Sequence, residues 1–89
     1  MSQLKAILVD DEISNLKGLE KKLKTLFPEI KITGMFQSPE DALNAINATQ
    51  LDILFLDIQM PRIDGFELLS RLKHINFEII FVTAYSEYA

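Results

Sequence analysis

The sequence contains no cysteine and no tryptophan, and it has only three prolines and three glycines. Without cysteine, disulfides and thiolate metal ligands are excluded, and a reducing compartment is the simpler expectation. Apolar runs such as 53–56 and 79–82 are far too short to cross a bilayer. The segment Met1–Lys5 does not resemble a signal peptide, because it leads directly into a strand-like run. We therefore expect a cytoplasmic protein that does not engage a membrane.

Positive charge is also scarce in this sequence. Thirteen acidic residues against nine basic ones give a formal net charge of −4. The densest basic segment, 17–24, also contains Glu20, and it is typical of a solvated helix face. We do not expect this chain by itself to bind nucleic acid. Its 89 residues, of which 48% are hydrophobic, are enough for one small globular domain.

Strand-like and helical patterns alternate along the whole sequence. Short apolar runs typical of strands lie at 4–9, 30–36, 53–56 and 75–82. Between them, apolar residues recur at helical spacing in 14–27, in a segment that begins at Ser38, and in 66–72. Ser38 and Pro39 suit a helix start, and Pro28 ends the preceding helix. The alternation predicts an α/β fold with a doubly wound parallel sheet that is covered on both faces.

Polar residues stand at the ends of three of these strands. Asp10 and Asp11 directly follow the first strand. Asp57 follows the third strand, and Thr83 ends the fourth. Ligands bind at the carboxyl ends of strands in open parallel sheets, so these side chains converge if the three strands are neighbours. Clustered carboxylates repel one another and a hard cation relieves that repulsion, while the lack of cysteine and the turn position of His74 argue against zinc. The pattern predicts a site for Mg2+, or for Mn2+.

The same arrangement suits phosphoryl chemistry. A carboxylate can accept a phosphoryl group as an acyl phosphate. The oxygens of the transferred group then need a cation and hydrogen-bond donors around them. Asp57 is placed to be the acceptor, and the expected donors are Thr83 and the backbone N–H groups of Ile58 and Gln59. The two carboxylates after the first strand are expected to hold the metal.

Four segments carry a wider resemblance, and they occur in a fixed order along the chain. They are Val9-Asp10-Asp11-Glu12, Leu56-Asp57-Ile58-Gln59-Met60-Pro61, Asp64-Gly65 and Val82-Thr83-Ala84-Tyr85. In order, spacing and structural context they resemble the receiver domain of a two-component response regulator, and the resemblance covers the whole chain. The final segment, Thr83–Ala89, is also similar to receivers that are joined to LytTR-type DNA-binding domains.

The resemblance implies a flavodoxin-like receiver fold with strand order 2-1-3-4, and a role for each matching residue. Asp57 matches the phosphoacceptor, and a partner histidine kinase is the implied phosphodonor. Asp11 matches the direct metal ligand, and Asp10 matches the acid that binds the metal chiefly through water. The backbone carbonyl of Gln59 completes the implied coordination, and Thr83 matches the switch hydroxyl. Such a receiver is no enzyme beyond its own phosphorylation and dephosphorylation, and it controls an output DNA-binding domain that lies outside this chain.

The sequence departs from the family pattern after the fourth strand. Members of this family continue with a fifth strand, whose terminal lysine pairs with the phosphoryl group, and with a fifth helix. We therefore expect residues 1–89 to form an incomplete receiver domain. Metal binding should persist because its ligands are present, whereas phosphorylation and switching should be weak without the lysine. The fourth strand also becomes an unguarded apolar edge, which favours self-association.

Simpler roles remain open for several of these residues. Asp11 would only cap the first helix, and Asp64-Gly65 would only make a turn. We favour the simpler role for Asp64-Gly65 but not for Asp11. Five phenylalanines are expected in the core: Phe36, Phe55, Phe66, Phe77 and Phe81. A phosphatase of the aspartyl-phosphate kind is disfavoured, because Gln59 stands where the general acid would be. The main alternative function is a Mg2+-binding interaction module that is not phosphorylated.

Overall fold

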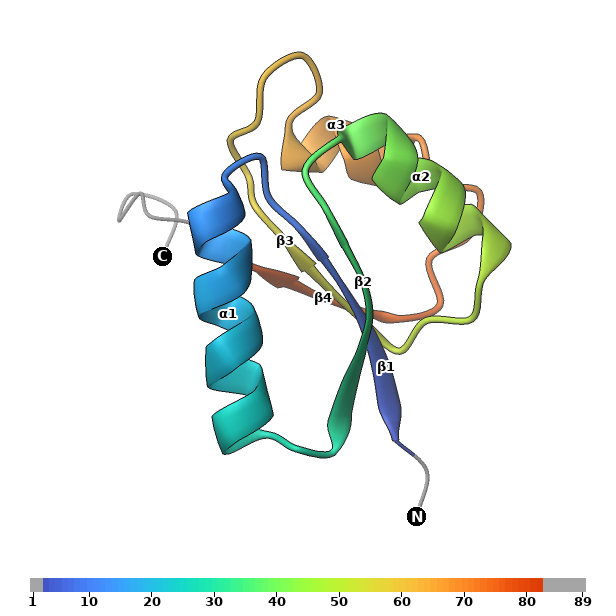
Figure 1. The fold of residues 1–89 in the computed structure, drawn as a ribbon. Helices are drawn as coiled ribbons and strands as arrows, with labels where there is room; N and C mark the ends of the chain where they lie inside the picture. The colour runs from blue at the N-terminus through green and yellow to red at the C-terminus, as the bar shows by residue number, and fades with distance from the viewer. Residues whose placement is uncertain (1–2, 83–89) are drawn as a thin grey trace.

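The computed structural model describes residues 3–82, in which strands and helices alternate (Figure 1). The elements in chain order are β1 (Leu4–Val9), α1 (Ile13–Leu26), β2 (Ile30–Phe36), α2 (Pro39–Ala48), β3 (Ile53–Leu56), α3 (Gly65–Ser70) and β4 (Glu78–Phe81). Strands β1, β2 and β3 have the bounds that the sequence predicted. Helices α1 and α3 begin one residue earlier than predicted, and α3 ends two residues earlier, at Ser70.

The four strands form one parallel sheet in the order β2-β1-β3-β4, which confirms the predicted strand order. In the central pair, Val9 of β1 lies opposite Leu56 of β3. The residues that follow these two positions therefore emerge side by side at the carboxyl edge of the sheet. On the other side of β1 the register with β2 shifts after Ala6, which leaves Thr33 as an extra residue. The Thr33 hydroxyl donates a hydrogen bond to the Ala6 carbonyl at 3.2 Å.

Side chains of the central strands alternate between two apolar layers. The layer on the side of α2 and α3 includes Ile7, Val9, Leu54 and Leu56. The layer on the side of α1 includes Ala6, Leu8 and Phe55. Figure 1 shows α1 on one face of the sheet and the other two helices on the opposite face. Burying one Leu or Ile side chain is worth about 1.5–3 kcal/mol, so these layers hold β1 and β3 firmly in the middle of the molecule.

Side-chain caps define the starts of two helices. The Ser38 hydroxyl accepts a hydrogen bond from the Asp41 N–H at 3.4 Å, and Pro39 occupies the first turn of α2, as predicted. The Asp64 carboxylate accepts a hydrogen bond from the Glu67 N–H at 2.8 Å and caps α3. Helix α1 starts after Glu12 without a side-chain cap, so the simpler role considered for Asp11 is wrong.

The phenylalanines are less buried than predicted. Phe55 lies in the core, and two others, Phe36 and Phe77, pack partly buried against it. Phe66 and Phe81 are 54% and 39% exposed, so their assignment to the core is wrong. Their rings contact each other outside the core, with centroids 5.2 Å apart. For Phe66 the reason lies in α3, where the fully buried Leu68 faces the sheet. Phe66 stands two positions earlier on the same helix, so its side chain points about 200° away from that of Leu68.

Strand β4 lies at one edge of the sheet formed by the described strands. Its side chain Ile80 is 44% exposed, and Phe81 beside it is also exposed. Among residues 3–82, no helix is long and apolar enough to span a membrane.

Candidate functional site

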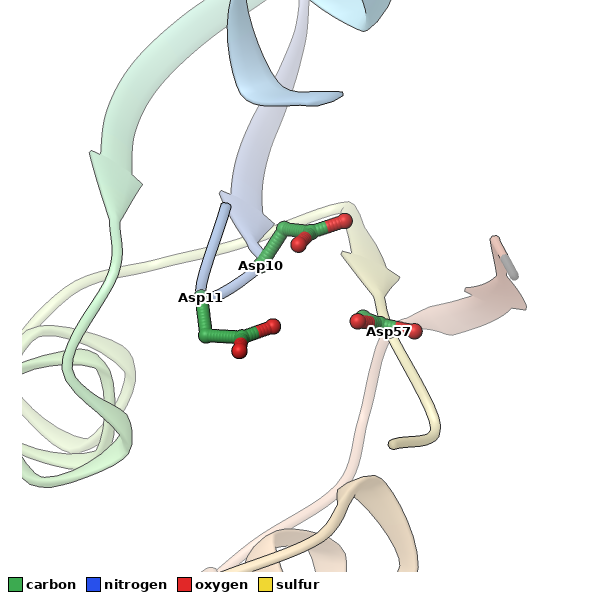
Figure 2. A group of neighbouring side chains, drawn as sticks. All are labelled: Asp10, Asp11 and Asp57. Atoms are coloured by element: carbon green, nitrogen blue, oxygen red, sulfur yellow. The ribbon is translucent and has the colours of Figure 1, made fainter. Parts of the chain in front are cut away.

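Two neighbouring strands deliver three carboxylates to one point. Asp10 and Asp11 follow β1, and Asp57 follows β3. The strand pairing continues one step beyond these strands, because the Asp57 N–H donates to the Val9 carbonyl at 3.0 Å. One carboxylate oxygen from each of the three aspartates lies within 4.8 Å of the other two. Figure 2 shows the three side chains around a common space, two from the β1 loop and one from the end of β3.

Burial and mutual repulsion shape the electrostatics of this cluster. Asp10 and Asp57 are only 7% and 9% exposed. Burial, together with the charges of Asp10 and then Asp11, raises the pKa of Asp57 to about 6, against the opposing hydrogen bonds from the Gln59 and Ile58 backbone N–H groups. Burial also raises the pKa of Asp10. Ionised carboxylates in this space are therefore destabilised until a positive charge joins them.

The donor set fits a hard divalent cation. Within residues 3–82, the cluster offers only carboxylate oxygens, and neither histidine nor cysteine takes part. Oxygen-only sites of one or two carboxylates with remaining water positions suit Mg2+. The three aspartates line an open cavity of about 800 Å³. Gln59 and several residues of α1 also line it. This cavity leaves room for metal-bound water and for a phosphoryl group.

Of the two remaining predicted site residues, the structure describes Gln59 but not Thr83. Gln59 lines the cavity two residues after Asp57, and the contribution of its carbonyl oxygen to a metal stays a prediction. Thr83 lies outside the described residues. Val82, just before it, lines the same cavity, and its N–H donates to the Leu56 carbonyl at 2.9 Å, next to the start of the Asp57 loop.

The loop after Asp57 is held by a close backbone approach. The Gly65 N–H donates to the Ile58 carbonyl at 2.8 Å. A Cβ atom on Gly65 would lie 2.6 Å from the Asp57 carbonyl oxygen, which is closer than real contacts allow. Further along the loop, Arg62 has a positive φ of 68° and pairs with Glu40 of α2 at 3.3 Å. The predicted turn at Asp64-Gly65 is wrong, because Asp64 is the N-cap and Gly65 is the first residue of α3, without a positive φ. The lack of a side chain on Gly65 instead lets α3 approach the Asp57 backbone.

Sequence reasoning missed two polar side chains that contact the cluster. The Asn15 Nδ2 group donates to Asp10 Oδ1 at 3.5 Å, and the Gln37 Nε2 group donates to the Asp11 carbonyl at 3.2 Å. Asn15 lies inside α1, and Gln37 directly follows β2 but is an amide, whereas the candidates chosen at the other strand ends were acids or a hydroxyl. Only the placement of α1 and of the segment after β2 around the end of β1 brings them to the aspartates.

Known proteins resemble this chain over almost its full length. The family model of the response regulator receiver domain matches residues 6–89. An uncharacterized response regulatory protein of Vibrio cholerae is 41% identical over 86 residues, which cover 94% of this chain and 33% of the relative. The transcriptional regulatory protein BtsR of Salmonella typhi is 39% identical over 88 residues, which cover 97% of this chain and 36% of BtsR.

A solved structure extends the likeness to three dimensions. The response regulator protein TrrA from Thermotoga maritima, in complex with Mg2+ and BeF, superposes with a TM-score of 0.82 at 32% identity. The match covers 97% of this chain and 74% of that chain. The present chain spans about a third of the length of the two curated relatives from Vibrio and Salmonella.

Proposed function

Since the chain belongs to the family of response regulator receiver domains, we propose that it accepts a phosphoryl group on Asp57 from a phosphohistidine of a partner histidine kinase. The observation that carries this proposal is the convergence of three carboxylates at the carboxyl ends of β1 and β3. Asp57 is the member of that cluster whose carboxylate has two backbone N–H donors beside it, those of Ile58 and Gln59, whereas Asp10 has one, from Glu12. A nucleophile, a site for a cation and donors for phosphoryl oxygens thus meet in one cavity.

Asp11, Asp10, Asp57 and the backbone carbonyl of Gln59 are the proposed ligands of Mg2+, or of Mn2+ in its place. The bound ion would neutralise charge on the cluster and on the phosphoryl oxygens. The support for this assignment is the all-oxygen donor set and the raised pKa of two of its carboxylates.

In the proposed reaction, a carboxylate oxygen of Asp57 attacks the phosphorus of the phosphohistidine. The phosphorus–nitrogen bond breaks, and its electron pair stays on the imidazole of the kinase. The backbone N–H groups of Ile58 and Gln59 then donate to the phosphoryl oxygens. We propose that the Thr83 hydroxyl moves to the same group as the switch. Loss of the phosphoryl group to water, which attacks the phosphorus and releases inorganic phosphate, returns Asp57 to its free state.

The finer setting of this function is also proposed. Relatives of this chain include transcriptional regulatory proteins of about three times its length, which supports a DNA-binding output domain in the complete protein. We further propose that this output domain is of the LytTR type, that the protein acts in the cytoplasm, and that the exposed edge strand β4 supports self-association.

The test is phosphorylation of the purified protein with acetyl phosphate and Mg2+, followed by intact-mass and peptide mass spectrometry. We expect one phosphoryl adduct on Asp57 that is absent from Asp57→Asn and absent when the metal is chelated. Mg2+ binding without any adduct would favour the alternative, an interaction module that is not phosphorylated. An adduct on another residue would contradict the assignment of Asp57.

A further inference from the structure

The orientation of Asp10 is set from helix α1. Its Oδ1 oxygen accepts a hydrogen bond from the Glu12 N–H at 2.9 Å. The same oxygen accepts a second bond from the Asn15 amide at 3.5 Å. Both donors belong to the start of α1, so they fix Oδ1 on the side of the helix. The other oxygen, Oδ2, accepts neither of these bonds, and Figure 2 shows the Asp10 carboxylate beside the space that it shares with the other two carboxylates.

We propose that Asn15 is a positioning residue of the metal site, acting through Asp10, and that it directs one oxygen of that carboxylate toward the bound cation. This inference rests on the proposed Mg2+ site. Residues that hydrogen-bond to a metal ligand fix its direction and contribute to the affinity of the metal without touching it. Asn15 also lines the cavity itself, beside Asp10.

The chemistry of the side chain at this position supports the proposal. Asn15 is the third residue of α1, a helix that has no side-chain cap and no acidic residue in its first turn. The positive end of the helix dipole generally favours an acid there. An acid at 15 would add a fourth carboxylate beside three that already repel one another. An amide instead supplies a neutral donor, which holds Asp10 without adding charge.

A purely structural role for Asn15 makes a different prediction. Asparagine is a weaker helix former than alanine, so Asn15→Ala favours helix α1 while it removes the hydrogen bond to Asp10. A structural role would therefore appear in the stability of the metal-free protein. A positioning role appears in the dissociation constant for the metal, measured on protein that is fully folded. The two roles are separated by measuring both quantities on the same variant.

The experiment is calorimetric titration of the full chain with MgCl2, in wild type, Asn15→Ala and Asn44→Ala. Asn44 makes a matched control, because it is an exposed asparagine inside helix α2 and it does not line the cavity. We expect Asn15→Ala to raise the dissociation constant about threefold to tenfold, less than a fully buried partner would cause, because Asn15 is exposed. The dissociation constant of Asn44→Ala should equal that of wild type. The metal-free melting temperatures of the two variants should agree closely.

Two results would overturn the inference, and they are distinguishable. If wild type binds Mg2+ and Asn15→Ala binds it within twofold of wild type, the positioning role is wrong and the proposed function stands. If wild type itself does not bind Mg2+, the proposed metal site is wrong and the positioning role falls with it.

Discussion

Asp57 combines two requirements that oppose each other. As a nucleophile it has to be ionised, yet burial and the neighbouring Asp10 raise its pKa to about 6. At pH 7 the ionised form still predominates, but it is less stable in the folded protein than in water. The charge that makes Asp57 reactive therefore costs folding stability in the absence of a cation, and a cation relieves that cost.

We expect Asp57→Asn to stabilise the metal-free protein at neutral pH. The folded-state pKa of Asp57 lies above the unfolded value of 3.8, so its contribution to stability is fully present below pH 3.8 and is lost as pH rises through about 6. After discounting for solvent screening, the gain on substitution is about 1 kcal/mol at pH 7. Urea unfolding with EDTA at pH 7 and at pH 3.5 measures it. The difference between variant and wild type should vanish at pH 3.5, and an equal difference at both pH values would show that the raised pKa of Asp57 is not its cause.

At the scale of single elements, the sequence predicted the strands and missed the rotation of a helix. Strands β1 and β3 were predictable because each apolar run ends at an aspartate that belongs at the sheet edge. Helix α3 was not, because its apolar residues fit two different stripes, one through Phe66 and one through Leu68. The close approach of Gly65 to the Asp57 backbone, which selects the second stripe, is a contact across the loop between β3 and α3 that apolar spacing does not reveal. Asn15 was missed because helical spacing does not show that its amide lies beside Asp10, five residues earlier in the loop after β1.

The contact between α3 and the Asp57 loop gives a second prediction. Gly65→Ala places a Cβ atom against backbone that cannot move aside cheaply, so it should destabilise the protein by about 1–3 kcal/mol. Gly18→Ala is the matched control, because Gly18 lies in the middle of α1 with nothing within 4 Å of a new Cβ. That control should stabilise the protein by about 0.5–1 kcal/mol through helix propensity. Urea unfolding of both variants tests the pair; equal effects would mean that the contact with Asp57 is unimportant.

At the scale of the whole molecule, the sheet order joins the site to the core. Strands β1 and β3 are the two central strands, and both apolar layers pack against them. The carboxylates that follow these strands are therefore held at a common edge only while the core is intact. The unfolded chain has no such cluster, so a cation that binds the three aspartates binds the folded state selectively and raises its stability.

Mg2+ is accordingly expected to raise the melting temperature of the wild-type protein. A ligand present at 100 times its dissociation constant adds about 2.7 kcal/mol, which for so small a domain is a shift on the order of 10 °C. Asp11→Asn should lose most of this shift, because it removes a proposed ligand. Glu29→Gln should keep this shift, because it removes an equal charge just before β2. That position is at the amino end of the parallel strands, whereas Asp57 lies at their carboxyl end. Scans with MgCl2, compared with NaCl at equal ionic strength, separate binding from screening. Equal shifts in the two variants would show that Mg2+ acts on net charge and that the three aspartates do not hold it.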